Sequence, residues 1–144
     1  MSIANLSNIL NIFRGSEPSP EEHRQVFKEV LLMTLARASH SDANVQTVEV
    51  ETVQTILQRV TGEEISVADI RVAASSELYE TAPLDSYLAK AGRVLNSTDR
   101  VTIVQSLAEV IKSDVDVSSS ETEFFDRVAV ALKLTPSELA GLTV

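Results

Sequence analysis

The 144-residue chain contains no cysteine, which excludes disulfide bonds and metal sites with thiolate ligands. It has only four glycines and four prolines, no tryptophan, and 4% aromatic residues. All-β folds with many short strands need turns richer in glycine and proline. Hydrophobic residues nevertheless make up 44% of the chain, enough to fill a core. The composition therefore favours a single helical domain.

Positive charge is also scarce. Twelve Lys and Arg residues stand against 21 Asp and Glu residues, a formal net charge of −9. Phosphate backbones repel so acidic a chain, so nucleic acid is not an expected partner. No apolar run approaches the roughly 18 residues of a membrane span, and the first residues lack the features of a signal peptide. We therefore expect a cytoplasmic protein without a membrane span.

Apolar residues recur at intervals of three and four throughout the chain, which predicts an all-α fold of seven to eight helices in a single domain. Residues 1–18 are expected to form a helix and a linker, and residues 19–144 the main helical domain. Predicted helices span about residues 1–13, 19–40, 47–60, 66–81, 84–95, 98–112, 118–132 and 135–141. Four starts carry a hydroxyl residue followed three positions later by an acid, as in a capping box: Ser19 and Glu22, Ser66 and Asp69, Ser118 and Glu121, Thr135 and Glu138.

An acidic loop occurs twice, with the copies 72 residues apart. Residues 41–51 read SDANVQTVEVE and residues 113–123 read SDVDVSSSETE. Each copy lies between two predicted helices, and after each pair a short connection leads to a new helix start. Two helix–loop–helix units related by an approximate two-fold axis would account for this repeat.

Each loop pairs an acid at the end of one helix with an acid in the first turn of the next. The pairs are Asp42 with Glu49 and Asp114 with Glu121. A tight turn would bring the members of each pair together, and Mg²⁺, Ca²⁺ or Mn²⁺ prefer such oxygen ligands. An EF-hand is excluded, because Ser119 and Phe125 stand where its Gly and bidentate Glu belong. The predicted ligands of a divalent cation are Asp42, Asn44, Glu49, Asp114, Asp116 and Glu121.

The same acids have a second explanation that needs no metal. Acids in the first turn of a helix interact favourably with the helix dipole, and Glu121 fits a capping box with Ser118. Asp42 and Asp114 are residues that cap turns through their own backbone. Duplicated caps would recur as faithfully as duplicated ligands, so the residues alone leave both explanations open.

The order and spacing of these motifs resemble the TerB-like family, named after a tellurite-resistance protein. The two acidic loops and the closing segment ALKLTPSE at residues 131–138 carry the resemblance, which covers roughly residues 25–142. It implies an all-helical domain of a stress-response or membrane-associated complex, with divalent metal proposed at Asp42, Glu49, Asp114 and Glu121. The chain departs from the family pattern where Ala43 and Val115 replace the Gly after each Asp.

No catalytic constellation is evident in the sequence. His23 lies in an acidic first turn, and the counterpart of His40 in the second loop is Lys112. Gly-rich phosphate loops, Ser-centred elbows and HExxH helices are missing from the sequence. We therefore expect a non-enzymatic binding module that acts through a protein partner. The alternatives are a Mg²⁺-dependent hydrolase or transferase that uses the acidic loops, and a structural adaptor whose loops are capped turns.

Overall fold

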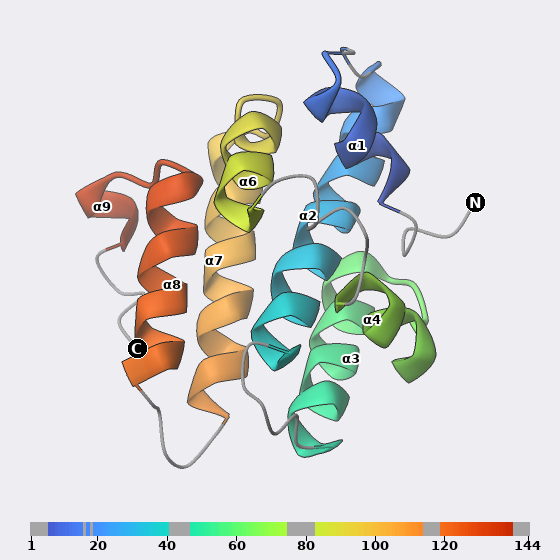
Figure 1. Cartoon of the computed structure of the whole chain (residues 1–144), viewed down its shortest axis with the longest axis vertical. Coiled ribbons are helices and arrows are strands. Elements are labelled where there is room, and N and C mark those ends of the chain that lie inside the picture. Colours follow the sequence, from blue (N-terminus) through green and yellow to red (C-terminus); the bar gives the residue numbers. More distant parts are fainter. Residues whose placement is uncertain are drawn as a thin grey trace.

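The computed structural model describes residues 6–15, 17, 19–40, 47–74, 83–113 and 119–139. Within these ranges it contains eight α-helices and no strand, which confirms the all-α prediction (Figure 1). The helices are α1 (Ser7–Phe13), α2 (Pro20–His40), α3 (Thr47–Thr61), α4 (Val67–Ala74), α6 (Leu84–Gly92), α7 (Ser97–Lys112), α8 (Ser119–Ala131) and α9 (Pro136–Leu139). None of them has the length and apolarity needed to cross a membrane.

Capping boxes set the starts of α2 and α9, as the sequence predicts. The amide of Glu22 donates to Ser19 Oγ at 3.3 Å, and the amide of Ser19 donates to Glu22 Oε1 at 2.9 Å. Thr135 and Glu138 make the same reciprocal pair at 3.2 and 2.8 Å. At the start of α4, Ser66 Oγ accepts a hydrogen bond from the Asp69 amide at 3.0 Å. The fourth predicted box includes Ser118, which lies outside the described residues.

Because of these caps, we expect part of the free energy of unfolding to be lost as the pH falls. Hydrogen bonds from Ser19 lower the pKa of Glu22 below its ordinary value of 4.5, and those from Thr135 lower the pKa of Glu138. Such carboxylates stabilise the native state above their unfolded pKa, and the contribution is lost as the pH falls through the native pKa. The Glu22→Gln, Glu138→Gln double variant should therefore lose less stability than the parent between about pH 5 and about pH 3. Urea unfolding at each pH measures this, and parallel curves would contradict it.

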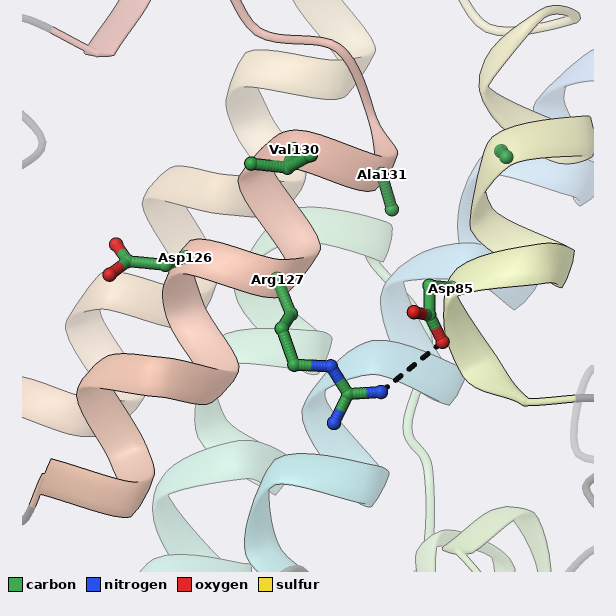
Figure 2. Close-up of a pocket in the computed structure, with 6 residues that line it drawn as sticks. Asp85, Asp126, Arg127, Val130 and Ala131 are labelled. Atoms are coloured by element: carbon green, nitrogen blue, oxygen red, sulfur yellow. Dashed lines mark hydrogen bonds and ion pairs between the residues drawn. The ribbon is translucent and has the colours of Figure 1, made fainter.

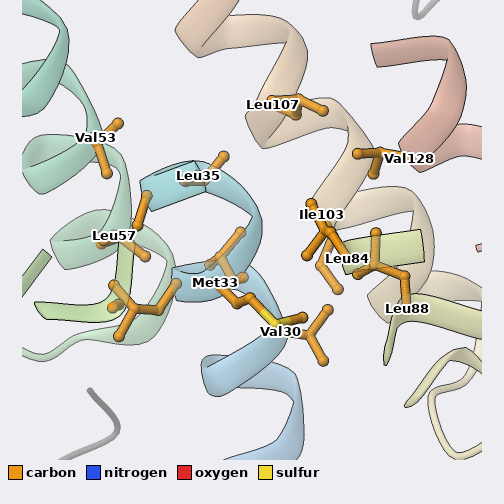
Figure 3. Packing of buried hydrophobic residues seen from close by; sticks show 14 of the residues in the cluster. Val30, Met33, Leu35, Val53, Leu57, Leu84, Leu88, Ile103, Leu107 and Val128 are labelled. Carbon is orange, nitrogen blue, oxygen red and sulfur yellow. The ribbon is translucent and has the colours of Figure 1, made fainter. Parts of the chain in front are cut away.

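Helix α2 forms the centre of the molecule. All seven residues from Val30 to Ala36 are buried, so the helix is covered on every side along two turns. It contacts α1, α3, α4, α6, α7 and α8. In Figure 3, Leu35 of α2 lies between Leu57 of α3 and Leu107 of α7. The core is therefore built around one helix that the flanking helices enclose.

The helix bounds repeat with the same offset as the acidic loops. Helix α2 ends at His40 and α3 begins at Thr47, while α7 ends at Lys112 and α8 begins at Ser119, both 72 residues later. Burial follows the same offset. Corresponding buried pairs are Leu31 and Ile103, Leu32 and Val104, Thr34 and Ser106, Leu35 and Leu107, Val53 and Phe125, Ile56 and Val128. These matches support two similar helix–loop–helix units, and the two-fold axis between them stays a prediction.

Two predicted helices differ in extent within the described residues, the first and the fifth. The first was expected from residue 1, whereas α1 begins at Ser7, directly after Leu6 in a left-handed conformation with φ 53°. The fifth was expected to reach Leu95, whereas α6 ends at Gly92. The fourth was expected to reach residue 81, and α4 is described to Ala74. Residues 75–82 lie outside the described ranges. Gly62 ends α3 with φ +73°, as expected of a glycine that follows a helix.

Candidate functional site

The structure gives the backbone positions of two of the six predicted cation ligands. Glu49 is the third residue of α3 and Glu121 the third residue of α8, so both acids lie in the first turn of their helices. The side chain of Glu121 is partly buried, and that of Glu49 is outside the description. The other four predicted ligands lie outside the described residues: Asp42, Asn44, Asp114 and Asp116.

The helix ends that border the two acidic loops lie toward the same end of the molecule. In Figure 1, the C-terminal ends of α2 and α7 and the starts of α3 and α8 all face the lower part of the view. Helix α7 packs against both α2 and α3. The described residues alone contain no group of three or more His, Asp and Glu that could hold a metal. A cation site would therefore depend on the residues between these helix ends.

A buried carboxylate that the sequence did not single out holds α1 in place. Glu29 of α2 is 2% exposed. Its oxygens accept hydrogen bonds from the Asn8 amide at 2.9 Å, Asn8 Nδ2 at 2.6 Å and the Ile9 amide at 3.3 Å. These amides belong to the first turn of α1, whose own N-cap, Leu6, provides no side-chain cap. Glu29 thus caps a helix other than its own.

Burial raises the pKa of Glu29, and the hydrogen bonds from Asn8 and Ile9 oppose that shift. The sequence held a signal for this residue. Glu29 lies on the same face of its helix as Val26 and Met33, three residues before and four after it, both of which are buried. A charged side chain on such a face must find hydrogen-bond donors, because an isolated buried charge is very costly.

The other end of α1 is held by helix α6. The ring of Phe13 lies 4.5 Å from the ring of Tyr87, measured between centroids. Lys90 Nζ donates to the Phe13 carbonyl oxygen at 3.2 Å and lies 4.5 Å from the centre of the Phe13 ring. Helix α1 therefore has a carboxylate at its N-terminal end and an ammonium group at its C-terminal end. Both charges complement the helix dipole.

A separate surface hollow of about 440 Å³ lies between α6 and α8 (Figure 2). It is lined by Asp85, Ala89, Asp126, Arg127, Val130 and Ala131. Arg127 Nη2 lies 3.2 Å from Asp85 Oδ1, and both side chains are well exposed, so the ion pair contributes little stability. None of the predicted cation ligands is among the lining residues. The hydrolase or transferase alternative places its chemistry on the acidic loops, so this hollow does not test it.

Comparison with known proteins identifies the helical domain. The family model described as Tellurite resistance protein TerB matches residues 28–143. No curated protein and no solved structure matches the chain significantly. The matched range begins within α2 and continues past α9, and it leaves α1 outside. Because the match covers most of the chain and the described fold is all-helical, the chain belongs to the TerB family.

Proposed function

We propose that this chain is a non-enzymatic helical binding module that holds a divalent cation between its two acidic loops. The observation that carries the proposal is the repeated placement of Glu49 and Glu121, each third in the helix that follows its loop. The bordering helix ends lie toward one end of the molecule, which is what a site shared by both loops requires (Figure 1). The net charge of −9 also favours cations over anions.

The donor set suits a hard cation. The loops offer carboxylate and amide oxygens, and the chain has no cysteine that would favour a thiophilic metal. Ca²⁺, Mg²⁺ and Mn²⁺ take six or more oxygen ligands, which three residues from each loop can provide. The first loop would contribute Asp42, Asn44 and Glu49, and the second Asp114, Asp116 and Glu121. The bound ion would tie the two helix–loop–helix units together.

The module is proposed to act through a protein partner, in the cytoplasm, within a stress-response or membrane-associated complex. The family to which the chain belongs, described as Tellurite resistance protein TerB, supports this role over catalysis. The ion then acts as a structural or regulatory ligand whose occupancy sets the rigidity of the loop end.

Thermal unfolding in EDTA, Mg²⁺, Ca²⁺, Mn²⁺ and Zn²⁺ at matched ionic strength tests the cation site. An ion at ten times its dissociation constant should add about 1.4 kcal/mol to the free energy of unfolding. For a domain of this size that raises the melting temperature by roughly 3–6 °C. We expect this shift for one or more of the hard cations and not for every divalent ion alike.

A pair of matched variants separates binding from charge screening. Asp42→Asn with Asp114→Asn should remove the ion-specific shift. Asp85→Asn with Asp126→Asn removes the same formal charge at the hollow between α6 and α8, and should keep the shift. A chain that shows no ion-specific shift at millimolar metal has no cation site, and its acidic loops are then capped turns of a structural adaptor.

A further inference from the structure

Helix α1 is set apart from the other described helices. It lies outside the range that matches the family, which starts at residue 28. Its sequence, SNILNIF, has no charged residue. It joins α2 through a short linker in which Gly15 has φ +101°. Any residue other than glycine would be strained in that backbone conformation. Helix α1 thus lies outside the matched range, uncharged and joined to α2 by a few residues.

The surface beneath α1 has the features of a receptor for a helix. The N-cap residue Leu6 and the α1 residues Ile9 and Ile12 are buried on it, at intervals of three along the chain. Helices α2 and α6 both contact α1 and form the two sides of this surface. Glu29 lies at the end that meets the helix N-terminus, and Lys90 at the end that meets its C-terminus. The charges therefore fix the direction in which a helix can lie.

Glu29 is the part of this surface that is difficult to explain by the packing of α2 alone. A carboxylate within the apolar stripe of α2 lowers stability unless donors are supplied to it. In the structure, Asn8 and Ile9 in the first turn of α1 supply these donors. A surface that carries such a carboxylate is suited to free backbone amides, and the first turn of a helix is where free amides are found.

We propose that the α2–α6 surface is a docking site for an amphipathic helix of a partner protein, and that α1 occupies it as a tethered competitor in the free chain. The partner helix would carry apolar residues at intervals of three or four, few charges on that face, and its N-terminus toward Glu29. This proposal rests on the binding-module role proposed above and is independent of the cation site.

Replacement of α1 by a partner helix on this surface is energetically feasible. A seven-residue helix is too short to be stable by itself in water, so α1 is helical because it is docked. The short linker holds it at an effective concentration on the order of millimolar. A partner helix must displace it, and its apparent affinity is reduced by the fraction of molecules whose surface is open.

The test uses the full chain in EDTA and a fluorescent peptide with the chain's own residues 1–15 as the probe. Ile9→Asp places a charge at a position that is 1% exposed and should undock the tethered α1. That variant should bind the peptide at least about tenfold more tightly than the parent. Asn11→Asp adds the same charge on the exposed side of α1 and should bind like the parent.

Two further measurements test whether Glu29 contributes to binding of the docked helix. Glu29→Gln, added to the Ile9→Asp chain, should weaken peptide binding several-fold, and a peptide that itself carries Ile9→Asp should not bind. Circular dichroism must show that the Ile9→Asp chain keeps its helices. If that chain unfolds, α1 is an integral part of the fold and the proposal is wrong. A folded Ile9→Asp chain that binds no more tightly than the parent overturns it as well, without bearing on the cation site.

Discussion

Leu35→Ala and Leu107→Ala should each lower the free energy of unfolding by about 2–5 kcal/mol. Both side chains are fully buried, Leu35 in α2 and Leu107 in α7, and they occupy corresponding positions 72 residues apart. Truncation removes apolar contacts and leaves a cavity that the surrounding helices close only in part. Because α2 and α7 each pack against α3 as well as against one another, neither site can collapse freely.

Urea unfolding of the two variants measures these losses, with Val130→Ala as the control. Val130 is 77% exposed, so its truncation should change stability by less than about 0.5 kcal/mol. If α2–α3 and α7–α8 are similar units, the two leucine variants should lose similar amounts. A loss near the control value at either position would mean that the side chain is not packed as described.

Glu29→Ala should raise the hydrogen-exchange rates of the α1 amides by roughly ten- to a hundredfold. Hydrogen bonds to a charged group contribute about 1.5–3 kcal/mol, and each 1.4 kcal/mol is about a factor of ten. Removing the carboxylate leaves the amides of Asn8 and Ile9 without that acceptor. Glu29→Gln keeps one acceptor oxygen and should have a smaller effect.

Native-state exchange of residues 7–13 gives the result directly, and Glu21→Ala is its control. Glu21 is an exposed acid in the first turn of α2, the helix that also carries Glu29, so its loss should leave α1 protected. Equal acceleration in both variants would show a general charge effect instead of a specific cap.

The pH dependence of Glu29 has the opposite sign to that of Glu22. Because burial raises the pKa of Glu29 above 4.5, its protonated form favours the native state. That contribution is fully present below the unfolded pKa and is lost as the pH rises through the native pKa.

Helix positions were largely predictable, because the signals that set them are local. The Ser19–Glu22 box and the apolar period placed α2 at residues 19–40, and the structure has it at Pro20–His40. One cap was missed: the helix was expected from about residue 98, whereas α7 begins at Ser97 and Asn96 Oδ1 caps it by accepting from the Asp99 amide at 2.8 Å. The spacing from Asn96 to Asp99 is the same as in the other caps, so the signal was present.

The site could be predicted only in part, because its geometry depends on contacts between distant segments. Periodicity put Glu49 and Glu121 in first turns, where the structure also has them. No local pattern fixes the distance between two loops that are 72 residues apart in sequence. The role of Glu29 was missed for the same reason, since its donors lie about twenty residues away and reach it only after α1 has docked.

During synthesis on the ribosome, α2 is made well before α7 and α8, two of the helices that enclose it. About 56 residues separate its end at His40 from the start of α7 at Ser97. At 5–20 residues per second, roughly 3–11 s pass before α7 begins to form. Until then α3 and α4 can cover only part of a helix in which Val30 to Ala36 are all destined for burial. The nascent chain therefore presents an apolar helix to chaperones, and to neighbouring nascent chains, for seconds in every round of translation.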